Sequence, residues 1–205
     1  MLSQGDQTGD ESVIDMLKTF IKNREQKPGN VFMGLVHRLD RPTSGVMVLA
    51  KTSKALSRLN QQFAEKTPQK VYWAMVSGKP KPSPTRLSHY LIRKPKQNKS
   101  FAHIKEVPNS KFAELIYTEK QRLDRYSLLE VELLTGRHHQ IRAQLCKEGV
   151  IIKGDLKYGA PRSNKNGSIH LHARKLTIVH PTMKEPISFV APTPEDPLWN
   201  STIKK

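Results

Sequence analysis

Two short segments hold most of the residues that could do chemistry. The first, HRLDRPTSG at residues 37–45, places the carboxylate of Asp40 between the cations Arg38 and Arg41 in a turn rich in Gly and Pro. Nearby positive charge favours the ionised form of a carboxylate. An ionised carboxylate suits a nucleophile or a general base better than a general acid. A solvated surface turn held by salt bridges would have the same local chemistry.

The second segment is LTGRHHQIR at residues 134–142, where Gly136 precedes a predicted short helix. Backbone amides at a helix N-terminus bind anions, and Arg137 adds positive charge there. Arg142 lies one turn into the helix, where a cation gains nothing from the helix dipole, so we expect it to have an acidic partner elsewhere in the chain. An ordinary basic helix face remains the alternative interpretation.

The eight histidines do not form a recognisable metal site. His170 and His172 alternate along a predicted strand, and His138 and His139 are adjacent, but neither a Cys pair nor an HExxH pattern accompanies them. We therefore expect no bound metal, and contacts of these side chains with backbone or substrate instead. No nucleotide-binding loop is present, so no cofactor is expected either.

Short elements must position these segments. Asp10 is the expected N-cap of a helix with apolar residues from Val13 to Ile21, and Thr52 or Ser53 that of a helix containing Leu59. A third short helix holds Ile141 and Leu145. Strands are predicted at residues 46–50, 71–77, 112–118, 126–134, 169–173, 176–179 and 187–190. The βαβ rhythm of a doubly wound fold is missing, which predicts an α+β fold with a mixed, largely antiparallel central sheet flanked by helices.

The stretch from Lys79 to Lys111 differs from the rest of the chain. It has nine Lys or Arg residues against one acid, Glu106, and five prolines interrupt it. This composition predicts a basic arm or projecting hairpin on a single domain that spans residues 1–205.

Charge and composition narrow the classes of function. The formal net charge is +17 over 205 residues, which favours a polyanionic partner, nucleic acid before an acidic membrane surface. Cys146 is the single cysteine, so no intramolecular disulfide is possible, and a reducing, cytoplasmic location is expected. No apolar run of 18 residues is present, so we predict no membrane span.

Four segments together resemble a known family. They are HRLDRPTSGVMVLAK (37–51), KVYWAMVSG (70–78), LLTGRHHQIRAQL (133–145) and IHLHARKL (169–176). In this order and spacing they resemble the signature blocks of the RluA-type RNA pseudouridine synthases, over roughly residues 35–181. The resemblance implies the pseudouridine synthase catalytic fold, no metal or other cofactor, and an RNA substrate, ribosomal or transfer, in a protein expected to be monomeric.

The resemblance also implies roles for individual residues. Asp40 corresponds to the catalytic aspartate, Tyr72 to the tyrosine under the target ring, and Arg142 to the arginine that pairs with the aspartate. Arg38 corresponds to the residue that helps take the base out of its stack, and Leu171 to an aliphatic residue of the uracil pocket. We expect further substrate or RNA contacts from the neighbours of these residues in the two segments, His37, Arg41, Arg137, His139 and Gln140.

One difference from the family concerns the N-terminus. Family members usually begin with a strand that has a Lys-Pro pair, and this sequence starts after that point. The central sheet is therefore expected to lack its first strand, and no separate RNA-binding domain is expected ahead of it.

The main alternative is an RNA-binding module or chaperone without catalysis, and a membrane-surface protein is the more distant one. The first would explain the charge and the basic arm, but it would not require Asp40, Tyr72 and Arg142 to meet. Their convergence in one cleft is the observation that distinguishes an enzyme from a binding module.

Overall fold

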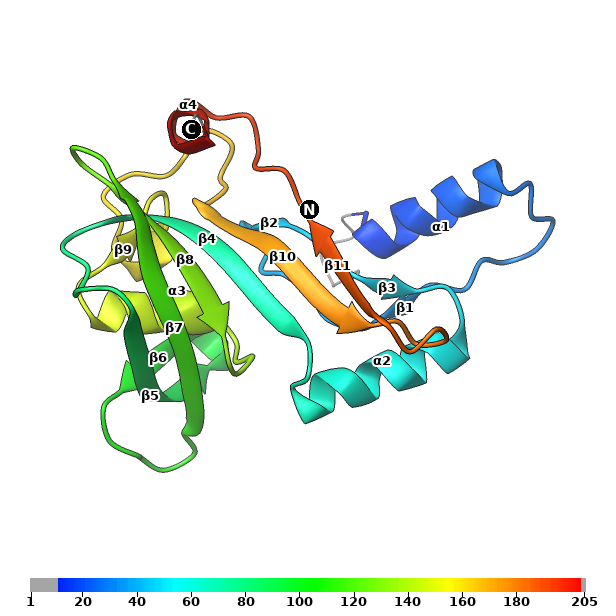
Figure 1. Ribbon diagram of the computed structural model, residues 1–205, viewed down its shortest axis with the longest axis horizontal. Coiled ribbons are helices and arrows are strands. Elements are labelled where there is room, and N and C mark those ends of the chain that lie inside the picture. The colour runs from blue at the N-terminus through cyan, green and yellow to red at the C-terminus, as the bar shows by residue number, and fades with distance from the viewer. Residues whose placement is uncertain (1–10, 204–205) are drawn as a thin grey trace.

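The computed structural model describes residues 11–203, and its main feature is a nine-stranded sheet (Figure 1). The strands along the sheet are, in order, β11 (Pro186–Val190), β10 (Leu171–Val179), β4 (Gln69–Ser77), β8 (Ser127–Leu133), β7 (Lys111–Arg122), β5 (Thr85–Lys94) and β6 (Lys99–His103). Two short strands join from the side: β2 (Ser44–Gly45) pairs with β10, and β9 (Ile151–Ile152) pairs with β4. The β2–β10 pair is parallel and the others are antiparallel, which confirms the predicted α+β class with a mixed, largely antiparallel sheet.

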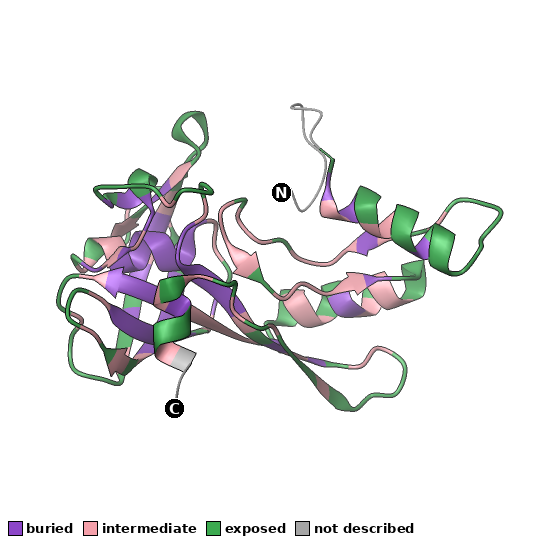
Figure 2. Ribbon diagram, turned by 90° about the horizontal axis from the view of Figure 1, so that it is seen from above, coloured by how far each residue is buried: buried purple, intermediate pink, exposed green. Residues whose placement is uncertain are grey.

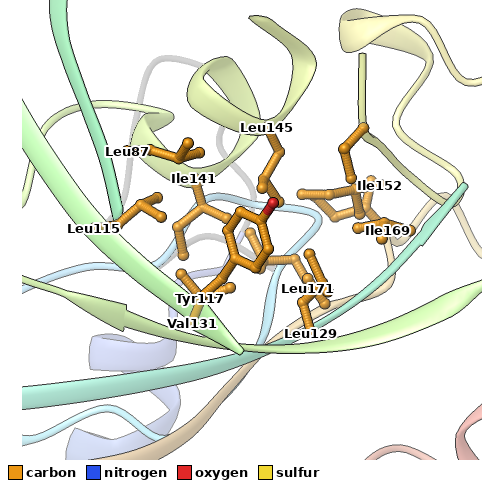
Figure 3. Packing of buried hydrophobic residues seen from close by; sticks show 13 residues of the cluster. Leu87, Leu115, Tyr117, Leu129, Val131, Ile141, Leu145, Ile152, Ile169 and Leu171 are labelled. Atoms are coloured by element: carbon orange, nitrogen blue, oxygen red, sulfur yellow. The ribbon is translucent and has the colours of Figure 1, made fainter. Parts of the chain in front are cut away.

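Alternating side chains of the central strands build two cores. One face of β4 and β8 packs against helix α3 (Gln140–Lys147) in a cluster that surrounds Tyr117 (Figure 3). On the opposite face, Met75 and Leu128 pack against Trp199 of α4 (Pro197–Ile203). Because side chains alternate along a strand, those of β4 pack into one cluster on each face. Both faces of β4 are therefore covered, and the strand lies in the middle of the molecule.

A second group of elements lies at the β10–β11 side of the sheet (Figure 1). It comprises α1 (Val13–Arg24), α2 (Ser53–Glu65) and the two-stranded pair of β1 (Gly34–Leu35) and β3 (Leu49–Ala50). Leu59 of α2 packs here against Leu176 and Ile178 of β10. Buried residues are concentrated in the other half, around β4, β8 and α3 (Figure 2).

Several elements differ from the sequence-based expectations. Ser12, whose hydroxyl accepts a hydrogen bond from the amide of Asp15, is the N-cap of α1, whereas the predicted cap, Asp10, lies outside the described residues. Thr52 caps α2 as predicted. The strand expected over residues 46–50 is only β3, and the two strands expected over 169–179 are one strand, β10, with a register shift between Ala173 and Lys175. The strands β1, β2 and β9 were not predicted, because two-residue strands have no periodicity to detect. The short helix α4 was not predicted either.

The basic stretch does form a hairpin, of β5 and β6, with the short 3-10 helix η1 (Pro95–Gln97) in its turn. It does not project as a separate arm. Residues Thr85 to Leu91 pair with β7, so the hairpin extends the main sheet and β6 forms its edge.

Candidate active site

Backbone contacts on both sides anchor the loop that holds Asp40. The amide of Thr43 donates to the carbonyl of Asp40 at 2.8 Å and closes a turn around Arg41 and Pro42. The carbonyl of Pro42 accepts from Ile169, and the amide of Val46 donates to Ala173, at 2.9 Å each. Between these two points lies Gly45, whose φ is +122° and where an added Cβ would overlap the backbone of Ala173. The loop therefore lies against the start of β10 in a conformation that requires glycine.

Arg142 joins two carboxylates. Its Nη1 atom lies 3.1 Å from Oδ2 of Asp40, which confirms the predicted contact between residues 102 positions apart. Its bidentate contact, however, is made with a different partner. Nε and Nη2 donate to the two carboxylate oxygens of Asp155, at 2.7 and 2.8 Å. Burial opposes the charge of Arg142, but hydrogen bonds and charge from Asp155 and Asp40 outweigh it and raise its pKa.

His139 contacts Asp40 from a second side. It is the N-cap of α3 and has a left-handed backbone, with φ of 52°. Its Nε2 atom lies 3.5 Å from Oδ2 of Asp40, and its Nδ1 atom lies 3.0 Å from the hydroxyl of Tyr158. Burial, reinforced by the charge of Arg142, lowers the pKa of His139 to about 2. The ring is therefore neutral, and it supplies contact rather than charge.

Asp40, Tyr72 and Arg142 line one cleft of about 240 Å³. Tyr72 comes from β4 and is half-buried, and Leu171 comes from β10, only 4% exposed. Together with Ile141 they make one wall of the cleft apolar. Ile141 and Leu171 also belong to the core cluster in Figure 3. Burial, together with the negative charge of Asp40, raises the pKa of the Tyr72 hydroxyl. Trp73, the next residue along β4, packs on the other face near Trp199.

The remaining predicted residues of the Asp40 segment have different surroundings. Arg38 is exposed and lines the cleft, with no hydrogen bond or ion pair to another residue in the range 11–203. His37 also lines the cleft, but its Nε2 atom accepts from the amide of Val48 at 3.0 Å, and burial lowers its pKa to about 4. Arg41 lies outside this cleft, in a neighbouring hollow of the same loop.

Two residues predicted to contact RNA also form hydrogen bonds within the protein. The side chain of Gln140, 3% exposed, accepts from the amide of Arg137 and the hydroxyl of Thr135, and it donates to the carbonyl of Glu114. The Arg137 guanidinium donates through Nε to the carbonyl of Phe112. Both residues line the cleft, yet the Arg137 amide expected to bind an anion is already paired with Gln140.

Sequence reasoning did not assign several residues of the site, among them Phe63 and Lys70, which line the cleft, and Asp155 and Tyr158, which lie behind it. The apolar period of α2 identified Phe63 only as a core residue. The position of Arg142 near a helix N-terminus indicated that an acid was needed, but eighteen acids were available. Nothing in the sequence singled out Asp155 among them.

The histidines outside the cleft bond within the chain. His172 lies 2.9 Å from the hydroxyl of Ser44, and His170 lies 2.9 Å from both Asn164 and Asp196. Among residues 11–203, no group of three or more His, Cys, Asp or Glu side chains is arranged to hold a metal ion. In the same range, no helix is long and apolar enough to cross a membrane.

Comparison with known sequences identifies a family and several relatives of this chain. Residues 1–147 match the RNA pseudouridylate synthase family. The chain is 37% identical over 164 residues to an uncharacterized RNA pseudouridine synthase of Synechocystis, covering 78% of this chain and 50% of that protein. It is 34% identical over 178 residues to ribosomal large subunit pseudouridine synthase C of Vibrio vulnificus, covering 84% and 55%. The chain thus spans about half the length of these relatives.

Solved structures show the same fold. Human RNA pseudouridylate synthase domain containing 4 superposes with a TM-score of 0.81 at 22% identity, over 99% of this chain and 85% of that one. The human domain-containing protein 1 gives a TM-score of 0.72 at 24% identity, over 91% and 77%. The fold, the sequence match and the RluA-type signature blocks agree, and the chain belongs to the RNA pseudouridylate synthase family.

Proposed function

We propose that this chain isomerises a specific uridine in structured RNA to pseudouridine, with Asp40 as the catalytic residue. The observation that carries the proposal is the convergence of Asp40, Tyr72 and Arg142 in one cleft, although they come from three distant segments. An RNA-binding module has no need to aim a carboxylate, held by a buried arginine, into an apolar pocket. The alternative of binding without catalysis therefore leaves the geometry of Arg142 unexplained.

The cleft fits a flat, largely apolar ring. Leu171 and Ile141 supply aliphatic contacts, Tyr72 supplies an aromatic face, and Asp40 lies beside them. A base inside a duplex cannot reach such a pocket, so the target uridine must leave its stack, as in other enzymes that modify bases. Loops and bulges of RNA make this extrusion easier. Arg38, exposed at the cleft and without an internal partner among the described residues, is suited to take the place of the extruded base or to hold its phosphate.

The reaction needs one group to act on the sugar. The N1–C1′ bond of uridine breaks, the uracil turns, C5 bonds to C1′, N1 takes up a proton and C5 releases one. Asp40 either attacks C1′ or removes a sugar proton to give a glycal-like intermediate, and its position beside Arg142 is compatible with both routes. Arg142 keeps the carboxylate aimed.

Tyr72 serves the reaction mainly through its ring. Because burial and Asp40 raise the pKa of its hydroxyl, that group is a poor proton acceptor in the empty cleft. Water is then the better acceptor for the proton that leaves C5.

The RNA is proposed to be ribosomal, in the cytoplasm. The name of the Vibrio vulnificus relative and the net charge of +17 support this choice, and a single cysteine fits a reducing compartment. Pseudouridines mapped in ribosomal and transfer RNA from cells with and without this protein would identify the uridine. A missing site in transfer RNA alone would contradict the ribosomal assignment.

The first prediction tests the catalytic role. Asp40→Asn is expected to abolish isomerisation while RNA affinity stays within a few-fold, because the amide keeps the shape of the side chain and loses its charge. The assay measures tritium released from C5 of labelled uridine in ribosomal RNA from cells that lack the protein.

The control for this prediction is Asp124→Asn, which neutralises an exposed acid in the turn between β7 and β8 and should retain full activity. Turnover by Asp40→Asn at a rate similar to that of the control would exclude Asp40 as the catalytic residue.

A further inference from the structure

The geometry points to Asp155 and Tyr158, from one short turn, as the positioning residues of the catalytic carboxylate. Asp40 is held by two side chains, Arg142 and His139. Asp155 fixes the first, and Tyr158 fixes the second. This inference rests on the proposed function, because it assigns a role relative to Asp40.

Asp155 determines where Arg142 points. Its carboxylate is 1% exposed and takes both Nε and Nη2 of the guanidinium, a two-point contact that fixes the plane of the group. Only Nη1 is directed to Asp40, whose side chain is 27% exposed. A buried carboxylate without its cation is costly, so the Asp155–Arg142 pair should stay closed whether the cleft is empty or occupied. Arg142 is then a fixed donor for Asp40.

Tyr158 fixes the second contact of Asp40. Its hydroxyl accepts from the amide of Ser100 at 2.9 Å, donates to the carbonyl of the same residue at 3.0 Å, and lies 3.0 Å from Nδ1 of His139. Ser100 belongs to β6, so these bonds tie the ring of His139 to the sheet. The face of the Tyr158 ring also lies 5.0 Å from the guanidinium carbon of Arg142. One side chain therefore supports both residues that contact Asp40.

The turn itself is built to be rigid. The 3-10 helix η2 (Leu156–Tyr158) lies between Gly154 and Gly159, whose φ angles of +85° and +104° are rarely adopted by other residues. The carbonyl of Asp155 accepts from the amides of both Tyr158 and Ala160, at 3.0 Å each. These contacts fix the spacing of Asp155 and Tyr158, and so the spacing of the two side chains that they support.

The test is a pair of double-mutant cycles read out as single-turnover rates with excess enzyme. Asp155→Asn should lower the rate about 100-fold, the order of loss that follows a small misplacement of a catalytic group. Tyr158→Phe, which keeps the ring and removes only the hydroxyl, should lower it about 3–10-fold. RNA affinity should stay within a few-fold in both variants, because neither residue lines the cleft.

The second half of each cycle tests whether a loss of rate comes from a misplaced Asp40 or from a general disturbance of the structure. In an Arg142→Gln background Asp155→Asn should cause no further loss, and in a His139→Asn background Tyr158→Phe should cause none, because the intermediate residue is already gone. Asparagine is chosen at position 139 because it tolerates the left-handed backbone. The Tyr158 cycle is an independent arm if Asp155→Asn does not fold, as judged by circular dichroism.

Rate losses that disappear in the Arg142→Gln and His139→Asn backgrounds support the inference. Losses of the same factor in the parent and in the second background overturn it, as does a folded Asp155→Asn variant with an unchanged rate. If Asp40→Asn itself remains active, the proposed function fails instead, so the two failures can be told apart.

Discussion

At the scale of single residues, Tyr72 shows how one side chain can serve both the fold and the cleft. Its position in β4 places its backbone between Ala173 of β10 and Val131 of β8, and its ring packs against the core around α3. The same ring lines the cleft beside Asp40. A substitution at this position therefore changes both the fit of a base and the packing of the strand, and the choice of variant decides which effect is measured.

The prediction for Tyr72 separates the contribution of its ring to RNA affinity from that of its hydroxyl. Tyr72→Phe should retain RNA affinity, because it keeps the stacking face, whereas Tyr72→Ala should weaken binding by about 1–3 kcal/mol, the worth of stacking a base on an aromatic side chain. Affinity is measured by titration of labelled RNA at constant salt, alongside thermal melting to correct for lost packing. Equal affinities for the two variants would mean that Tyr72 does not lie under the base.

The contacts of Arg142 show what the sequence could and could not predict at this scale. The resemblance to RluA-type enzymes predicted its pairing with Asp40, and the distance of 3.1 Å confirms it. The bidentate partner Asp155 was not predicted, because the pairing depends on a turn whose path has no periodic signal. Gln140 and His37 were assigned by motif alone, and their internal hydrogen bonds follow from loop geometry that motif spacing does not contain.

At the scale of elements, the turn of the β5–β6 hairpin contacts His138, the neighbour of the cleft residue His139. Asn98, in its turn, contacts His138 through Oδ1 at 3.2 Å and accepts from Lys157 through its carbonyl at 3.0 Å. The exposed cations Arg93, Lys94 and Lys96 lie on the same turn. The hairpin thus brings positive charge close to the residues that surround Asp40.

The hairpin prediction concerns salt dependence. Replacing Arg93, Lys94 and Lys96 by Gln should flatten the slope of log affinity against log salt by about 2–3 units, because each phosphate contact contributes roughly one. The matched control replaces Lys22, Lys54 and Lys184, exposed cations of α1, α2 and the β10–β11 turn. A slope that changes equally in both triple variants would show that the hairpin makes no particular contact with RNA.

Long elements could be predicted from the sequence and very short ones could not. The apolar period identified α1, α2 and β4, because a run of nine or more residues repeats its pattern several times. The pairing of β7 with β5 was missed because prolines and lysines in residues 79–111 indicated a free arm. In the fold, Leu87 and Leu91 of this region are buried, and they attach it to the sheet.

At the scale of the whole molecule, pH should control stability through histidines that the fold keeps neutral. Burial, and secondarily the charge of Lys70, lowers the pKa of His37 to about 4, whereas an unfolded histidine titrates near 6.5. Between these values the unfolded chain binds a proton that the folded chain does not. The free energy of unfolding must therefore fall as pH decreases from about 6.5 to about 4.

The corresponding prediction is that His37→Gln makes this loss shallower, by up to about one proton in the slope against pH. Glutamine retains an acceptor for the amide of Val48. Urea unfolding at several values between about pH 4 and 7 measures the slope. Asn60→Gln, at an exposed position of α2, is the control and should leave the slope as in the parent, because neither amide titrates. A His37→Gln slope identical to that of the control would mean that His37 is charged in the folded state.

The pairing of β2 with β10 has a consequence for folding during synthesis on the ribosome. Asp40 is made early, but its loop is held by Ile169 and Ala173, and Arg142 and Asp155 also follow later. Proteins emerge from the N-terminus at about 5–20 residues per second. The loop that holds Asp40 therefore cannot pack against β10 until that strand has left the exit tunnel, several seconds after the loop is synthesised. An arrested chain that ends before residue 169 would contain Asp40 but lack the residues of β10 that hold its loop.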